Sequence, residues 1–192
     1  MTARTHDLVA FSSLAAVFAS TTLIPISFST AVLAVLANLI GGIAPDIDQP
    51  TAPLWRNLPV GKYVGKVFDK FLGGHRFLSH SLIGLALFGF IFHLLLTFFR
   101  PVMPHVNISY VWWAFMIGMA THLIMDSLTK EGVPWLLPIP YKFGFPPLKA
   151  WRITTGKKVE NWLVFPLIVA LDVFLALHFS KHLLYLIHYR IY

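Results

Sequence analysis

The chain has 192 residues, of which 57% are hydrophobic, 15% aromatic and only 12% charged, with a formal net charge of +7. Soluble domains carry about 25% charged residues, so this composition excludes a water-soluble globule, and its hydrophobicity excludes a disordered chain. The absence of cysteine excludes disulfides, thiolate zinc sites and a cysteine nucleophile, so any bound metal has to use His, Asp or Glu. We expect one integral membrane domain over residues 1–192, an all-α polytopic helical bundle.

Five apolar segments approach the roughly 20 residues that a transmembrane helix needs. In chain order they are residues 8–24, 30–44, 80–99, 110–128 and 162–179, the last of which could continue to 187. Only a short stretch around Pro25 separates the first two segments, so these should form a helical hairpin. The second segment is short and contains Asn38 and Gly41-Gly42, so a re-entrant element is an alternative there. The first segment begins after Arg4 like a signal peptide, but its apolar run continues past Ala19 and we expect it to be retained.

The basic residues are distributed unequally between the two ends of these helices. With five spans, 12 of the 15 Lys and Arg residues lie on the side of the N-terminus, and only Arg100, Lys181 and Arg190 lie on the other. Because cytoplasmic loops carry an excess of Lys and Arg, we expect a cytoplasmic N-terminus and two long cytoplasmic loops, in a bacterial or archaeal inner membrane. The charge is spread over loops beside the membrane, which favours contact with anionic lipid headgroups over nucleic-acid binding.

Potential metal ligands cluster at the cytoplasmic ends of the predicted helices. They are His6, Asp46, Asp48, His75, His80, His122, Asp126 and Glu160. His122 and Asp126 are four residues apart, a spacing that places both on one helical face within reach of one ion. A mixture of imidazole and carboxylate suits Zn, Mn or Fe better than Ca or Mg. The candidates exceed the needs of one four-coordinate ion, so we expect one or two divalent ions, with zinc as the first choice, and some residues that only orient the ligands.

Each of these residues also has a structural explanation. Residues at the ends of the predicted helices can form turns, cap helices or complement the helix dipole, which applies to Asp46, Asp48, His75, His80 and Glu160. His122 and Asp126 can form a hydrogen-bonded pair between helices, and His6 can be a residue of the membrane interface. The joint position of all of them at one end, and no single residue, favours a metal site. The remaining histidines and Asp172 lie within the spans or toward the other end and are left out of the predicted site.

Short motifs around these residues run from position 5 to position 160. They are Thr5-His6, Pro45-Asp46-Ile47-Asp48, His75-Arg76, His80-Ser81, residues 122–129, 132–134 and 152–156, and Glu160. Together they resemble the YdjM-like family of membrane-bound metal-dependent hydrolases, which includes LexA-regulated inner-membrane members. Phe77 departs from the family, which often has a small residue between the two histidines. The resemblance implies a distant similarity to zinc-dependent phospholipase C and P1-type nucleases, and hence hydrolysis of a phosphoester or lipid-like substrate.

The leading hypothesis is therefore metal-dependent hydrolysis at the cytoplasmic membrane surface. A divalent metal lowers the pKa of bound water toward roughly 7 and so supplies hydroxide at neutral pH. The expected metal ligands are His6, Asp46, Asp48, His75, His80, His122 and Asp126. Glu160, as a general base or a further ligand, and Arg76 are the expected catalytic residues. Arg76 and Arg152 are also expected to bind an anionic headgroup, because a guanidinium matches the geometry of phosphate.

Other functions remain open from the sequence. A metal-binding transporter or ion-handling protein could use the same ligands, and in a purely structural protein the polar cluster would only lock the helices. The Pro- and aromatic-rich residues 135–151 are expected to form an interfacial lid, or equally an aromatic belt without a role in binding. The expected partners are membrane lipid and a lipid-phosphate substrate. The sequence contains no His-Glu-x-x-His pair, phosphate-binding glycine loop or Gly-x-Ser-x-Gly elbow, which sets aside three common hydrolase classes.

Overall fold

The computed structural model describes residues 1–20, 26–74, 76–139 and 141–188, and these residues are mostly helical. The long helices are α1 (Ala3–Ser20), α2 (Phe28–Ile43), α5 (Leu82–Phe99), α6 (Ile108–Ser127) and α7 (Phe165–His188). The short elements are η1 (Ala44–Asp48), α3 (Pro53–Arg56), α4 (Gly61–Phe71), η2 (Leu78–His80), η3 (Arg100–Val102), η4 (Lys149–Trp151) and the π-helical turn η5 (Glu160–Val164). The predicted all-α bundle is confirmed.

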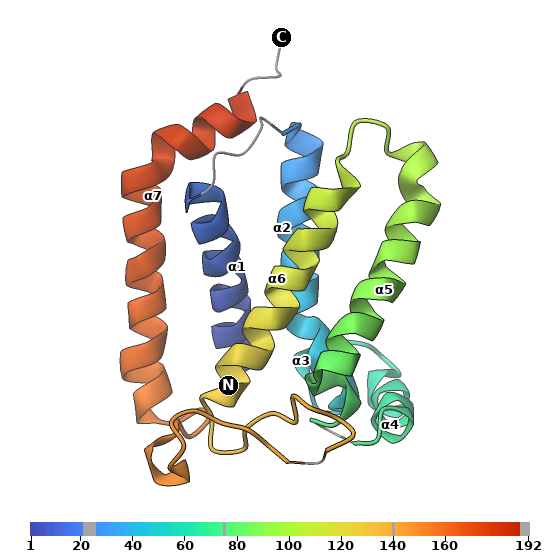
Figure 1. Ribbon diagram of the computed structural model, residues 1–192, viewed down its shortest axis with the longest axis vertical. Coiled ribbons are helices and arrows are strands. Elements are labelled where there is room, and N and C mark those ends of the chain that lie inside the picture. Colours follow the sequence, from blue (N-terminus) through green and yellow to red (C-terminus); the bar gives the residue numbers. More distant parts are fainter. Residues whose placement is uncertain (21–25, 75, 140, 189–192) are drawn as a thin grey trace.

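The long helices run side by side, with α2 and α6 in the centre, α1 and α7 on one side and α5 on the other (Figure 1). The N-terminus, α3, α4 and the loop that follows α6 all lie at one end of the bundle, which we name the site end. In that loop, backbone pairing joins Thr129 to Ile153 and Val133 to Phe143. The chain therefore folds back on itself between α6 and α7.

Within the described residues, four helices are long and apolar enough to cross a membrane: Phe28–Asp48, Leu82–Val102, Ile108–Ser127 and Glu160–Phe179. They correspond to the last four of the five predicted segments. The first segment is represented by α1, which packs against α2, α6 and α7 but is not one of these four, and residues 21–25 lie outside the described part of the chain. Helix α2 continues without a break into η1, so residues 30–44 belong to a span-length helix and not to a re-entrant element.

Polar residues define where three of these helices begin. The hydroxyl of Ser27 accepts the backbone N–H of Thr30 at the start of α2, and that of Ser81 accepts the N–H of Gly84 at the start of α5. The side-chain amide oxygen of Asn107 accepts the backbone N–H of Ser109 at the start of α6. Such caps satisfy N–H groups that have no partner within the helix. Ser81, and not the neighbouring His80, therefore supplies the cap of α5.

Small residues bring α2 and α6 into close contact. A Cβ atom on Gly41 would overlap the carbonyl oxygen of Phe115, and one on Gly118 would overlap the carbonyl oxygen of Asn38. The Asn38 side chain then donates a hydrogen bond of 3.1 Å to the carbonyl of Ala114. Small residues and polar bonds of this kind hold helices together where lipid leaves little hydrophobic driving force. This contact fixes the register of α6 against α2.

The outer faces of the bundle are apolar, as a bilayer requires. Large exposed side chains on α5 and α7 include Phe90, Ile91, Phe98, Leu167, Val173 and Leu177. The interior between α2, α5 and α6 is filled by a smaller cluster around Phe115, Met119 and Leu123. Exposed apolar patches of this extent are rare on soluble monomers, so the arrangement agrees with a membrane-spanning bundle.

We expect Gly118→Val to destabilise the bundle, because the added side chain has to displace the backbone of α2. Overpacking of a tight core costs about 1–3 kcal/mol, and here the obstacle is backbone. Thermal unfolding in detergent should show a clear fall in the apparent Tm. Ile124→Ala on the exposed face of the same helix is the control and should leave the Tm nearly unchanged. An unchanged Tm for Gly118→Val would contradict the close α2–α6 contact.

Candidate metal centre

The site is built around His122 and Asp126, which lie one turn apart near the end of α6 and are both buried. The Nδ1 atom of His122 lies 2.6 Å from the carbonyl oxygen of Gly42 on α2. A carbonyl oxygen can only accept, so Nδ1 carries the proton and Nε2 keeps its lone pair. That Nε2 atom is buried without a hydrogen bond, 3.6 Å from an oxygen of Asp46 and 3.7 Å from one of Asp126. An unsatisfied imidazole nitrogen that faces two carboxylates is the arrangement expected of a metal ligand.

Two further histidines come to this point from other elements. His6 of α1 stacks on the ring of His122 at 3.7 Å, and its Nε2 lies 3.2 Å from Asp126. The Nε2 atom of His80, in η2, lies 3.6 Å from Asp126 and 3.8 Å from Asp46. The ligand atoms form two groups, each within 4.8 Å, which share His122: His6, His122 and Asp126, and Asp46, His80 and His122. Four separate elements therefore converge on one point.

The spacing of these atoms suits a cation. Most of the distances, at 3.6–3.8 Å, are too long for hydrogen bonds. Two ligands of a tetrahedral ion with bonds of 2.0–2.1 Å are about 3.3–3.4 Å apart, so small side-chain movements would bring the groups to metal distance. The donors are nitrogen and oxygen only, as zinc, manganese and iron accept.

Asp48 lies behind His80 and outside the two groups of potential ligand atoms. Its Oδ2 atom is 3.5 Å from Nδ1 of His80 and accepts hydrogen bonds from the backbone N–H of Arg76 and the hydroxyl of Ser79. Burial by itself lowers the pKa of His80, but its interactions with Asp126 and Asp48 outweigh this effect and raise the pKa above the usual value. A carboxylate behind a histidine orients the ring and raises its basicity, as in many metal sites.

Arg76 lies inside the protein and pairs with the site. Its guanidinium is 2.7 Å from Asp126 and donates to the hydroxyl of Thr129 at 3.1 Å. The terminal amine of Met1 also contacts Asp126. The backbone of Arg76 has a φ of 59°, a left-handed conformation that is uncommon for a side chain of this size. Arg76 therefore compensates the charge of Asp126. Its expected contact with an anionic headgroup stays a prediction.

Glu160 and Arg152, two other predicted site residues, do not belong to the two groups. Glu160 is buried and accepts hydrogen bonds from the backbone and hydroxyl of Thr2, the hydroxyl of Thr5 and the backbone of Gly156. These bonds attach the start of α1 to the turn before α7. Arg152 donates to the carbonyl oxygens of Pro146 and Pro147. His75, the remaining predicted ligand, lies outside the described residues.

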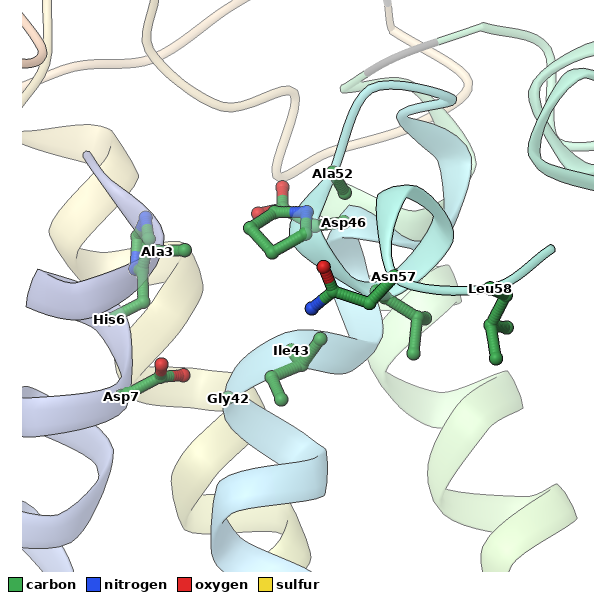
Figure 2. Close-up of a pocket in the computed structure, with 11 residues that line it drawn as sticks. Ala3, His6, Asp7, Gly42, Ile43, Asp46, Ala52, Asn57 and Leu58 are labelled. Atoms are coloured by element: carbon green, nitrogen blue, oxygen red, sulfur yellow. The ribbon is translucent and has the colours of Figure 1, made fainter. Parts of the chain in front are cut away.

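A pocket of about 350 Å³ opens beside the histidine cluster. Figure 2 shows His6 and Asp7 of α1 on one wall and Asp46 and Asn57 on the other. Its remaining lining is largely apolar and comes from Ala3, Gly42, Ile43, Ala52, Pro53, Leu54 and Leu58. His6 belongs to one group of potential ligands and Asp46 to the other, so both groups reach the pocket. No described residue of the predicted lid, 135–151, lines it.

Comparison with known proteins places the chain in a family. Residues 1–184 match the family described as YdjM inner membrane protein. The chain belongs to the YdjM family. Among its curated relatives, "Uncharacterized protein YvsG" of Bacillus subtilis is 33% identical over 116 residues, and "Inner membrane protein YdjM" of Escherichia coli is 31% identical over 129 residues. These matches cover 60% and 66% of this chain, and 63% and 59% of the relatives, so the chain aligns with about three fifths of their length. No solved structure matches it.

The family match confirms the resemblance drawn from the sequence motifs, and this YdjM-family protein is an integral membrane protein by family and by its apolar helices. Sequence reasoning missed Asp7 and Asn57, which line the pocket. Asp7 stands next to His6, and this adjacency was a signal that could have included it. Asn57 ends the short helix α3 and stands near no motif, so only the tertiary fold brings it to the pocket.

We expect Glu160→Ala to loosen the N-terminal segment of this YdjM-family protein, because the donors of Thr2, Thr5 and Gly156 lose their shared acceptor. Leaving buried donors unsatisfied costs about 1–3 kcal/mol. Hydrogen exchange should then be faster at the start of α1, and the apparent Tm should fall. Glu131→Ala, at a side chain that is 63% exposed, is the control. Unchanged exchange in Glu160→Ala would show that this carboxylate does not anchor α1.

Proposed function

We propose that this protein is a membrane-bound metal-dependent hydrolase that acts on an amphipathic phosphoester at the cytoplasmic membrane surface. The observation that carries the proposal is the buried, unsatisfied Nε2 atom of His122, set between two carboxylates and beside an open pocket. A protein that needed these groups only to lock its helices would be expected to satisfy them with one another. The distances of 3.6–3.8 Å between the histidine nitrogens and the carboxylate oxygens support a metal ion bound between these groups.

In this proposal the metal ligands are His6, Asp46, His80, His122 and Asp126. They would bind either one ion or two adjacent ions, one in each of the two groups that contain His122. When bound, a divalent ion there would supply Lewis-acid catalysis and a water of lowered pKa. Zinc is the first choice for this donor set, with manganese or iron as alternatives. The carbonyl of Gly42 holds the ring of His122. The Ser79 hydroxyl, 2.9 Å from Nδ1 of His80 and itself bonded to Asp48, holds the ring of His80, so both Nε2 atoms face inward.

The pocket supports an amphipathic substrate. Its polar side chains, His6 and Asp7 on one wall and Asp46 and Asn57 on the other, would face a headgroup bound to the metal, and its apolar lining suits the adjoining hydrocarbon. Arg76 stays with Asp126 in this proposal and balances its charge. Because Glu160 already accepts several hydrogen bonds and does not line the pocket, its proposed role is to anchor α1 and not to act as a base.

We expect the purified protein to contain one or two transition-metal ions per chain by elemental analysis. Replacing both His122 and Asp126 with Ala removes the shared ligand and its neighbour, and should remove most of the metal. His93→Ala, at an exposed position on α5, is the matched control and should keep it. Because the double variant removes the buried carboxylate that faces Arg76 and so disturbs folding, Asp46→Asn provides a second test at the partly exposed edge. Wild-type protein without metal after purification in metal-containing buffer would count against the site.

Activity is tested with the metal-loaded protein in lipid nanodiscs. Bis(p-nitrophenyl) phosphate and short-chain phospholipids serve as substrates. Asp46→Asn removes a proposed ligand and should lower turnover by at least the roughly 10–100-fold that loss of an outer-shell partner causes. Asp69→Asn on α4 is the matched control, since its side chain lies outside the pocket and outside both groups of potential ligands. Metal-dependent turnover that falls in Asp46→Asn and stays unchanged in the control would support the proposal. Binding of the metal with ion flux into liposomes, but without turnover, would instead support a metal transporter.

The proposed cytoplasmic position of the N-terminus rests on charge. The site end carries most of the Lys and Arg residues, and cytoplasmic segments carry this excess. Because the chain has no cysteine, Lys62→Cys and Lys149→Cys each create a single reporter. Both should be protected from an impermeant thiol reagent in intact cells and react after permeabilisation. Arg100→Cys, at the opposite end, is the control and should react in intact cells; the reverse pattern would overturn the topology.

A further inference from the structure

The short helix α4 is fastened to the rest of the site end along one face. Gly61 and Gly65 lie against Trp55, and a Cβ atom on Gly65 would be 2.8 Å from the Trp55 ring. The same ring stacks on Phe68 at 5.5 Å and donates a hydrogen bond of 3.0 Å to the carbonyl of Ile47 in η1. Trp55 thus connects α4 with η1, the element that carries Asp46. The glycine face of α4 is its packed face.

The opposite side of α4 exposes a stripe of large apolar side chains. Tyr63, Val67 and Phe71 follow one another at intervals of four residues and are 73%, 67% and 82% exposed. Residues four apart lie on one side of a helix, so the three side chains form one continuous surface. No other described element of the chain covers these three side chains.

A second exposed stripe runs beside the apolar one. Lys62, Lys66 and Lys70 each precede one of the three apolar residues and are all exposed, against a single acidic residue of the helix, Asp69. Apolar and basic stripes side by side on one exposed helix surface are typical of helices that lie in the membrane interface. The apolar side chains enter the acyl boundary, and the lysine stems reach back to the headgroups.

We propose that α4 lies on the bilayer and binds the anionic headgroups of the leaflet at the site end. Its position agrees with this: it connects the membrane span that ends at Asp48 with the one that begins at Leu82, beside the lower end of α5 (Figure 1). Lysine side chains near an anionic leaflet are attracted to its headgroups, so the basic stripe matches a charged lipid surface. A protein partner would explain the apolar stripe but would not require its position between two membrane spans.

Binding of α4 to the bilayer would also set the depth, relative to the membrane, of the pocket beside the histidine cluster. Leu54 of α3, together with Asn57 and Leu58 directly after it, lines that pocket, and α3 is held to α4 through Trp55. A helix α4 seated in the interface would therefore hold the pocket mouth at headgroup level, where an amphipathic substrate is available. This last step rests on the proposed function, whereas the lipid binding of α4 does not.

The test uses a single cysteine in the full-length protein, reconstituted in vesicles. Val67→Cys carries an environment-sensitive NBD label on the apolar stripe, and Asp69→Cys, about 160° around the helix axis, is the matched control. In vesicles that contain phosphatidylglycerol, the label at 67 should emit at shorter wavelength. It should be quenched several-fold less by aqueous iodide than the label at 69, and it should be quenched by brominated lipid tails. The protein needs neither bound metal nor activity for this measurement.

The basic stripe is tested by adding Lys62→Glu, Lys66→Glu and Lys70→Glu to the Val67→Cys protein. Iodide quenching should then rise toward that of the label at 69, and the original protein should show a similar rise in pure phosphatidylcholine vesicles. Equal iodide quenching at 67 and 69 in anionic vesicles would overturn the proposal. Protection of 67 from iodide without quenching by brominated lipid would also overturn it, since a protein or a second copy would then cover the stripe. Failure of the hydrolase assay leaves these readouts unaffected.

Discussion

The close contact between α2 and α6 is the constraint on which the rest of the site depends. Gly41 and Gly118 remove the side chains that would keep the two helices apart, and the backbones approach until the carbonyl of Gly42 reaches the imidazole of His122. That one hydrogen bond fixes the proton on Nδ1 and turns Nε2 toward the carboxylates. Register between two helices thus decides which nitrogen of a histidine is available. The same contact brings η1, which follows α2 directly, close to the end of α6.

Burial of charge is the cost that this arrangement has to offset. Asp126 is almost fully buried; the guanidinium of Arg76 and the terminal amine of Met1 balance its charge, and the rings of His6, His80 and His122 face it. Buried carboxylates without such partners are strongly destabilising. Asp48 is compensated in a different way, by the backbone of Arg76 and the hydroxyl of Ser79. The cluster combines well-paired groups with the unsatisfied Nε2 atom of His122, and the proposed metal site rests on this difference.

The site end joins three kinds of surface within a short distance. The spans give a lipid-facing exterior, the histidine cluster gives a buried polar interior, and α3 with α4 gives an amphipathic edge between them. The pocket opens where these surfaces meet, lined by α1, the end of α2 and α3. A substrate with a charged head and an apolar tail would meet both environments there, so the proposed position of α4 on the membrane and the proposed chemistry of the pocket are compatible.

The sequence by itself determined the membrane class, the helical bundle and the end at which the polar residues gather, because apolar length, charge bias and the spacing of His122 and Asp126 are local properties. It also carried the family, since the motifs extend over most of the chain. Only the tertiary structure separated the candidates: it joined His6, Asp46 and His80 to the α6 pair, set Asp48 behind His80, and bound Glu160 to the N-terminal segment. Those differences depend on the direction in which each side chain points, and contacts between helices that are distant in the sequence set this direction. Periodicity within one segment contains no information about that direction.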